Sequence, residues 1–173
     1  FSDGMVMQQQ TRANLWGTAT PNAPVKITTS WDKQTYKTTA DAKGAWKLAL
    51  STPSAGGPYT ITFDDGKLTE IRDILMGELW LCSGQSNMEM PMKGFKNQPV
   101  ENSNTDVMNS RNPQLRLFTV KRTSSFIPKT DVVGTWQEAV PATVREFSAT
   151  AYYFGRMMQQ QLNIPVGLIV ASW

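Results

Sequence analysis

The sequence predicts a mixed fold, in which a small all-β domain precedes the first half of an α/β domain. Residues 14–73 form short alternating segments separated by turns, which is typical of an antiparallel β-sandwich. From Ile74 onwards, apolar runs alternate with helical patterns, the order that builds a parallel sheet. We therefore expect a β-sandwich of the jelly-roll or immunoglobulin-like kind over residues 1–72. The N-terminal part of a three-layer, flavodoxin-like α/β/α domain should follow over residues 73–173.

Short segments rich in β-branched and aromatic residues predict the strands of the first domain. The expected strands are 15–18, 25–31, 34–40, 45–50 and 59–63. Gly, Asn, Asp and Pro residues fall between them, as tight turns require. In Val25-Lys26-Ile27 every second residue is apolar, so one face of that strand should point into a core.

Three apolar segments predict the strands of the second domain, at 78–82, 114–120 and 166–171, with helices at 105–111 and 146–162. The first is a continuous apolar run, as expected of a strand buried on both faces. In the longer helix one apolar face is expected, formed by Phe147, Ala151, Phe154, Met158 and Leu162. Pro165 then ends the helix. Because no further strand follows, we expect a truncated sheet with an unpaired edge and an uncovered apolar face. Such a chain should self-associate or require the missing C-terminal half of its own domain.

Composition excludes several classes of site. The 173 residues include no histidine, so the chain cannot form a self-contained Ser-His-Asp hydrolase or a His-ligated metal site. The single cysteine, Cys82, cannot form an internal disulfide, and inside an apolar strand its thiol should stay protonated and inert. Lys and Arg number 17 against 14 Asp and Glu and are scattered, so nucleic acid is not an expected partner. The longest apolar runs are far shorter than the about 20 residues of a membrane span, and no signal peptide is visible.

The strongest candidate for chemistry is the turn Gly84-Gln85-Ser86-Asn87 after the first buried strand. A serine just past the carboxyl end of a parallel strand is held where the sheet opens to solvent, and the glycine permits a sharp turn. The backbone N–H of such a serine can face a developing oxyanion. A structural alternative stays open, because Ser86 and Glu89 also match a helix capping box. Pro91 disfavours that alternative, since it limits any helix here to about one turn.

Other reactive side chains have plainer interpretations. Lys93 does not stand at a known nucleophile–lysine spacing from Ser86. Glu78 and Glu89 flank the serine, but surface or capping roles are preferred to a paired-carboxylate site. Three methionines at alternate positions could ligate a soft metal but more often fill irregular gaps; they are Met88, Met90 and Met92. Of the six tryptophans, most are interpreted as core, and Trp31 and Trp173 are the candidates for stacking on a sugar.

Residues 78–88, which include the G-Q-S-N-M turn at Gly84 to Met88, resemble the first block of the sialate O-acetylesterase group of SGNH hydrolases. Other landmarks of that family occur in the same order at 1–8, 16–17, 44–46, 56–59, 134–136, 147–156 and 165–169. The resemblance implies that Ser86 is the catalytic nucleophile and that Gly84, Gln85 and Asn87 complete the oxyanion and nucleophile turn. The family's oxyanion glycine follows a Ser-Trp pair like Ser172-Trp173. Its asparagine block and Asp-x-x-His block lie further on, so residues 1–173 alone should be inactive.

The resemblance implies an esterase that removes O-acetyl groups from sialic acid or related sugars through an acetyl-serine intermediate. Its substrate is then an acetylated sugar or sialoglycan, it needs no metal or organic cofactor, and its location is secreted or periplasmic. Trp173 is a candidate substrate-binding residue at the edge of the same sheet. Two alternatives stay open: an acetylxylan-type esterase, and a non-catalytic carbohydrate-binding β-sandwich module.

Overall fold

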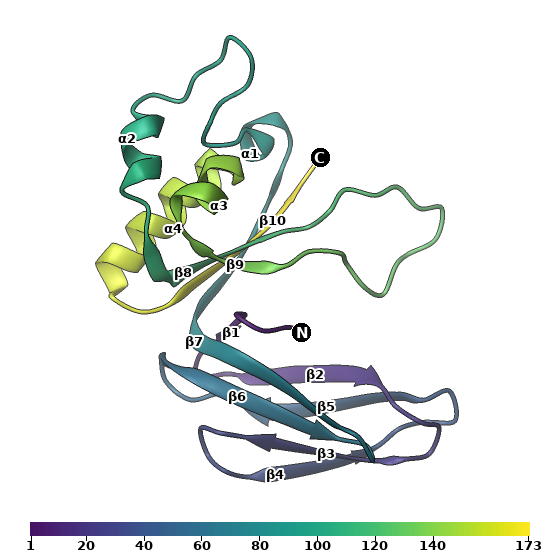
Figure 1. Ribbon diagram of the computed structural model, residues 1–173. Coiled ribbons are helices and arrows are strands. Elements are labelled where there is room, and N and C mark those ends of the chain that lie inside the picture. Colours follow the sequence, from purple (N-terminus) through teal and green to yellow (C-terminus); the bar gives the residue numbers. More distant parts are fainter. The chain divides into compact units, whose positions relative to one another are not determined.

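The computed structural model describes residues 1–173, which divide into an N-terminal unit, Phe1–Gly77, and a C-terminal unit, Glu78–Trp173 (Figure 1). The chain is a mixed α/β protein. The sequence placed a domain boundary at residue 72, which lies inside the long strand β7 (Leu68–Gly84). This strand gives its first residues to the N-terminal unit and its last residues to the C-terminal unit, so each unit is described by itself.

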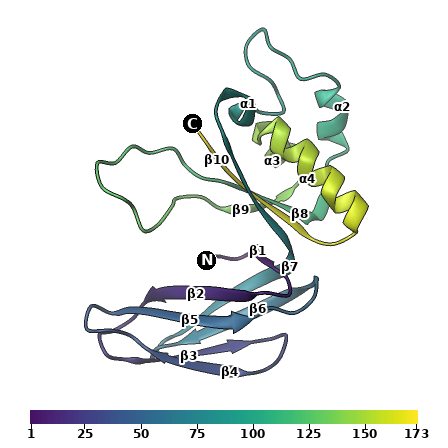
Figure 2. The same ribbon diagram turned by 180° about the vertical axis from the view of Figure 1, so that it is seen from behind.

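The N-terminal unit is built from strands in two sheets, which Figures 1 and 2 show from opposite sides. Its strands besides β7 are β1 (Val6–Gln8), β2 (Arg12–Thr18), β3 (Pro24–Thr29), β4 (Thr35–Thr39), β5 (Ala45–Ser51) and β6 (Gly56–Asp64). One sheet has the order β4-β3-β6-β7 with antiparallel pairing, and β1 pairs in parallel with β7. The other sheet is the antiparallel pair β2-β5. Leu15, Ile27 and Ile61 are all 0% exposed, so both sheets contribute to the core.

All five strands expected in this unit are present within a few residues of their predicted ends. Strand β1 and the first part of β7 were not predicted from the sequence. Strand β1 has only three residues, too few to show an alternation. The start of β7, from Leu68 to Glu70, is exposed and carries Thr and Glu, so no apolar pattern marks it.

The C-terminal unit has a sheet of order β7-β10-β8-β9 with four helices (Figure 1). Its elements after β7 are α1 (Ser86–Glu89), α2 (Ser103–Met108), β8 (Asn112–Thr119), β9 (Trp136–Ala139), α3 (Pro141–Glu146), α4 (Ala149–Leu162) and β10 (Val166–Ser172). Strand β10 is parallel to both β7 and β8, as the alternating order predicted, and β9 is antiparallel to β8. The main core lies where Leu117 and Leu168 of the sheet meet Val144 and Tyr152 of α3 and α4.

The prediction that 78–82 is buried on both faces is wrong. Cys82 is 8% exposed, but Trp80 is 39% and Leu81 is 70% exposed. Successive side chains of a strand point to opposite faces. Cys82 joins the core under the helices, and the Trp80 ring packs edge-on against Phe154 of α4 at 5.1 Å. Leu81 points to the opposite face of the sheet, which no helix covers at this position. Its side chain is therefore exposed to solvent.

The long helix begins later than predicted. Residues 141–146 form the separate helix α3, and α4 starts at Ala149, because the Ser148 hydroxyl caps it by accepting the Ala151 N–H at 3.2 Å. Its buried residues are Ala149, Ala151, Tyr152, Gly155 and Gln159. The expected apolar face was wrong at Leu162, which is 44% exposed. The short helix expected at 105–111 is α2, shifted towards the N-terminus, while α3 and β9 were not predicted.

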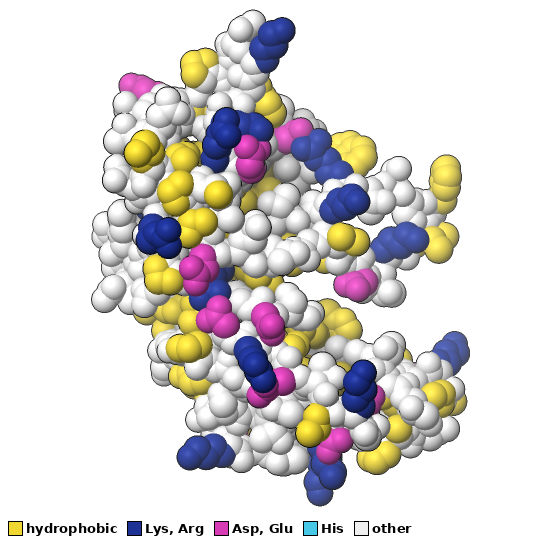
Figure 3. Space-filling view, in the orientation of Figure 1, with side chains coloured by type: hydrophobic (Ala, Val, Ile, Leu, Met, Phe, Trp, Pro, Cys, Tyr) yellow, Lys and Arg dark blue, Asp and Glu magenta, His cyan; other side chains and the backbone are white.

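The surface in Figure 3 shows Lys and Arg side chains interspersed with Asp and Glu. Ion pairs account for part of this mixing, such as Lys26 with Asp64 and Lys93 with Glu146. None of the helices has the length and hydropathy that crossing a membrane requires.

Candidate active site

Ser86 lies directly past the carboxyl end of β7, exposed to solvent. Strand β10 ends at the same edge, because Ser172 pairs with Gly84 and the Trp173 N–H donates to the Gly84 carbonyl at 3.0 Å. In open α/β sheets this edge is where ligands bind. The Trp173 side chain is 69% exposed at that edge. The structure therefore brings Ser86 and Trp173, two predicted site residues that lie far apart in the sequence, to the same edge.

The capping alternative for Ser86 is wrong. The N-cap residue of α1 is Gln85, which makes no side-chain cap hydrogen bond, and Ser86 is the first helical residue. No hydrogen bond joins the Ser86 hydroxyl to another group of the chain. As the first residue of a helix, Ser86 also has a backbone N–H without an intrahelical acceptor. Both its Oγ and its N–H are thus available to a ligand.

The turn before Ser86 leaves little room for a side chain at Gly84. A Cβ on Gly84 would lie 3.1 Å from the Cβ of Met88, which is tighter than ordinary van der Waals contact. After the turn, the Glu89 N–H donates to the Gln85 carbonyl at 2.9 Å and the Met90 N–H to the Ser86 carbonyl at 3.0 Å. These bonds close one helical turn and fix the backbone on both sides of the serine.

The helix α1 is anchored on the start of α4. The Thr150 hydroxyl donates to the Asn87 carbonyl at 3.0 Å, and the Ala149 N–H donates to the Met90 carbonyl at 2.8 Å. The Ser148 hydroxyl contacts the Met88 sulfur at 3.4 Å. Partners about sixty positions away thus hold the serine turn, and no local sequence signal could have identified Thr150 as one of them.

Glu89 and Lys93, two of the charged residues that the sequence analysis considered beside Ser86, each form an ion pair. Glu89 pairs with Arg122 at 2.5 Å, so its carboxylate serves an ion pair rather than a helix cap. The Lys93 ammonium group forms an ion pair with the Glu146 carboxylate at 2.5 Å, and not with Ser86. Glu78 lies on β7, eight positions before Ser86 in the sequence, and its backbone N–H donates to the Pro165 carbonyl at 3.0 Å.

Sulfur-containing residues of this region lie mostly in the core. Burial raises the pKa of the Cys82 thiol, which favours the protonated, unreactive form. Met92 is 0% exposed, and Met88 packs against the same apolar cluster. The chain has no group of three or more Cys, Asp and Glu side chains arranged to hold a metal ion.

A partly buried ion pair braces the helical layer behind the turn. Asp106 of α2 accepts hydrogen bonds from Arg156 and from the Tyr153 hydroxyl of α4, each at 2.7 Å. These bonds lower the pKa of Asp106. The pKa of Tyr153 is raised to about 12, mainly by burial and secondly by its hydrogen bond to Asp106. Both shifts favour the charged carboxylate and the neutral phenol, which keeps α2 attached to α4.

The tryptophans differ from their prediction as core residues, since none of the six is fully buried. Trp31 lies in the N-terminal unit, where its ring NH donates to the Ser51 carbonyl at 3.3 Å and its ring packs on Tyr59. Trp16 is 56% exposed, and the sequence analysis did not single it out.

Comparison with known proteins relates the whole chain to acetylesterases. No family model matches. The chain is 31% identical to the sialate O-acetylesterase of Rattus norvegicus over 98% of its own length and 34% of that protein. It is 30% identical to the Homo sapiens sialate O-acetylesterase over 100% of its own length and 36% of that protein. A carbohydrate acetylesterase from Xanthomonas citri has a similar structure, with a TM-score of 0.91 at 33% identity, over 99% of this chain and 39% of that one. The chain thus spans little more than a third of the length of these relatives.

Proposed function

Starting from the homology of the whole chain to the sialate O-acetylesterases, we propose that it carries the nucleophile of a serine esterase acting on O-acetylated sugars. The observation that carries the proposal is the state of Ser86: exposed at the carboxyl end of a parallel strand, with a hydroxyl that neither caps a helix nor bonds to the chain. Its position in a homologue of acetylesterases makes acyl transfer the reaction that this serine supports best.

In the proposed reaction the Ser86 oxygen attacks the carbonyl carbon of the acetyl ester. The Oγ proton passes to a general base, and the carbonyl oxygen becomes an oxyanion that the Ser86 N–H can stabilise. The bond between the acetyl carbon and the sugar oxygen then breaks, and the sugar leaves after taking up a proton. Water subsequently hydrolyses the acetyl-serine, which releases acetate and restores the hydroxyl. Gly84, Gln85 and Asn87 act by fixing the turn on which the serine stands.

The general base is not a histidine of residues 1–173, because these contain none. General-base catalysis typically contributes about 10² to 10⁴ in rate, and one oxyanion donor about 10² to 10³. We therefore expect residues 1–173 alone to hydrolyse p-nitrophenyl acetate no faster than their Ser86→Ala variant. A clear rate difference between the two would show that a base within this chain activates the serine.

The nature of the substrate is proposed from the relatives. We propose an acetylated sialic acid or sialoglycan as the substrate, with acetylxylan as the alternative, and we propose that Trp173 contacts the sugar at the edge of the sheet. We also propose a secreted or periplasmic location, where such glycans are found. A panel of O-acetylated sialosides and acetylated xylo-oligosaccharides, assayed with the full-length protein that contains this chain, distinguishes the two substrate classes by their kcat/KM.

Covalent labelling tests the role of Ser86 directly. In the full-length protein a fluorophosphonate probe should add one phosphonyl group, located to Ser86 by peptide mass spectrometry. The Ser86→Ala variant should lose the label. Ser83→Ala is the matched control, because Ser83 is also exposed and lies three residues earlier on β7, and it should keep the label. Absence of labelling in an active, folded protein, or labelling that survives Ser86→Ala, would overturn the proposal.

A further inference from the structure

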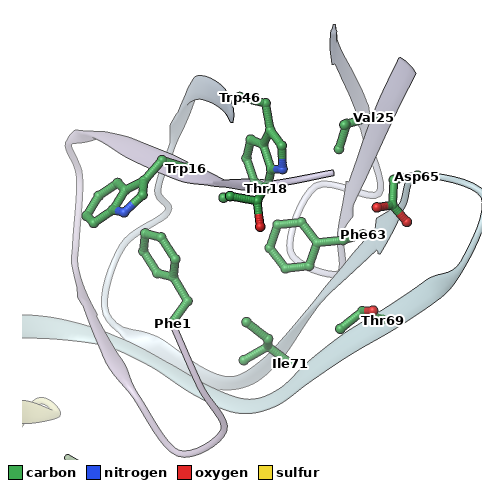
Figure 4. Close-up of a pocket in the computed structure, with 10 residues that line it drawn as sticks. Phe1, Trp16, Thr18, Val25, Trp46, Phe63, Asp65, Thr69 and Ile71 are labelled. Carbon is green, nitrogen blue, oxygen red and sulfur yellow. The ribbon is translucent and has the colours of Figure 1, made fainter. Parts of the chain in front are cut away.

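An open cavity of about 270 Å³ lies within the N-terminal unit (Figure 4). Its walls come from the β2-β5 sheet, which supplies Trp16, Thr18 and Trp46, and from the other sheet, which supplies Phe63 and Thr69. The volume is close to the lower end of small-molecule sites, which span about 300 to 1,000 Å³. The cavity is therefore small, and its size suits a single sugar ring.

Aromatic rings line this cavity in two pairs (Figure 4). Phe1 packs edge-on against Trp16 with 4.6 Å between ring centroids, and Trp46 packs against Phe63 at 5.7 Å. Phe1 and Trp16 are nevertheless 51% and 56% exposed. Large aromatic rings left in water beside a cavity are typical of binding sites rather than of a core.

The backbone is arranged to leave space for one of these rings. Gly17 pairs with Trp46 across the β2-β5 ladder, and a Cβ on Gly17 would lie 2.7 Å from the Trp46 ring. Any side chain at position 17 would therefore push the indole out of its place. The cavity depends on this glycine, which the sequence analysis noted only as part of a family landmark.

We propose that this cavity binds a neutral pyranose sugar, which stacks its C–H face on the exposed ring of Trp16. A pyranose combines an apolar face with peripheral hydroxyl groups, and the cavity offers aromatic surface together with the hydroxyls of Thr18 and Thr69 and the carboxylate of Asp65. Asp65 carries the only charged side chain of the lining. A carboxylate accepts hydrogen bonds from sugar hydroxyls but repels an anionic sugar, so uncharged saccharides are favoured over sialic acid.

This inference uses the N-terminal unit only and does not depend on the role proposed for Ser86. A substitution at Ser86 should leave sugar binding unchanged, and loss of sugar binding should leave phosphonate labelling unchanged. The two proposals can therefore fail separately.

The test is a titration of the ¹⁵N-labelled chain with xylobiose and with cellobiose, followed through the indole N–H resonances. We expect the Trp16 and Trp46 signals to shift in a saturable way, with a dissociation constant on the order of 1 mM or lower, and the signal of Trp80 in the C-terminal unit to stay in place. N-acetylneuraminic acid should bind at least tenfold more weakly. Absence of a saturable shift with both neutral disaccharides at about ten times that concentration would overturn the proposal.

Variants locate the site. Trp16→Ala should weaken binding at least tenfold, whereas Trp80→Ala, which removes an indole that is 39% exposed in the C-terminal unit, should not. If Trp16→Ala fails to fold, Thr69→Arg at the exposed rim replaces it, since the long side chain should block the cavity. Thr39→Arg on the exposed strand β4 is its matched control and should bind normally. In Asp65→Asn, the ratio of the dissociation constants of N-acetylneuraminic acid and of the neutral disaccharides should fall at least threefold. An unchanged ratio would contradict the role given to the Asp65 carboxylate.

Discussion

Replacing Gly155 by alanine tests how tightly α4 packs on β10, the contact that supports the serine turn. The new Cβ would lie 2.5 Å and 2.9 Å from the two Cδ atoms of Leu168 and 3.0 Å from its Cγ. Leu168 is 0% exposed and lies in the core cluster, so its displacement would disturb other core side chains. Such overpacking costs about 1–3 kcal/mol, while glycine to alanine inside a helix gains about 1 kcal/mol. The free energy of unfolding should therefore fall by about 1 kcal/mol, within a range of about 0 to 2 kcal/mol.

Urea unfolding of the chain, followed by circular dichroism, measures this change. Gln160 gives the matched control, because it lies exposed on the same helix. There the Gln160→Ala variant should be more stable than Gln160→Gly by about 1 kcal/mol, which is the helix term alone. Leu168→Ala should cost about 2–5 kcal/mol, and in the double variant the methyl group introduced by Gly155→Ala should fill part of the space left by Leu168, so that the two losses do not add. If Gly155→Ala stabilises the protein as much as the control pair predicts, the packing argument is refuted.

Three further predictions concern the surroundings of the serine turn. Thr150→Val keeps the shape of the side chain but removes the hydrogen bond to the Asn87 carbonyl; it should cost about 0.5–1.5 kcal/mol in urea unfolding and speed amide exchange in α1, and unchanged exchange there would contradict the anchoring role. Tyr153, with its pKa raised to about 12, stabilises the fold fully below about pH 10, and this contribution should disappear as pH rises through 12; absorbance titration should show the phenol ionising near 12, and nearer 10 in Asp106→Asn. Cys82 should react slowly with a thiol reagent at pH 8 in the native chain and rapidly in urea, whereas equal rates would show that the thiol is not protected.

The acidic limb of stability follows from the lowered pKa of Asp106. A carboxylate whose pKa is depressed in the folded state contributes stability above its ordinary pKa, and this contribution is lost as pH falls through the folded value. The sign is opposite to that of the Tyr153 phenol. The hydrogen-bonded pair is therefore expected to stabilise the attachment of α2 to α4 across the neutral range and to weaken it at both extremes.

The strands of the N-terminal unit could be predicted because their turns carry a strong local signal. Gly44 has a φ of 84° and Asn22 a φ of 60°, conformations that few other residues adopt easily, and both lie between expected strands. The parallel pairing of β10 with β7 could be predicted from the alternation of strands and helices. Strand β9 could not, because its four residues pair with β8 across a long connecting segment that carries no periodic pattern.

Burial was predicted less well than element type. Apolar residues of 78–82 indicate a strand, but its exposure depends on which elements cover each face. The helices of the C-terminal unit cover the face of Cys82, and Leu81 remains 70% exposed on the other. Likewise, the buried face of α4 includes Gly155, whose missing side chain allows the close approach of Leu168. The apolar periodicity therefore selected Ala151 correctly, missed Gly155 and selected Leu162 wrongly.

The position of Ser86 and its activation are separable in this chain. The turn is closed by its own backbone hydrogen bonds, leaves little room for a side chain at Gly84, and is anchored by Thr150 and Ala149 at the start of α4. All of these groups lie within the C-terminal unit, so the location of the hydroxyl is set by residues 78–173. In the reaction proposed for Ser86, its activation needs a general base, and residues 1–173 contain no histidine to act as one. Substitutions at Thr150 should therefore alter where the oxygen lies without altering its proton affinity, and a change in the rate of labelling with no change in its pH dependence is the signature that distinguishes the two.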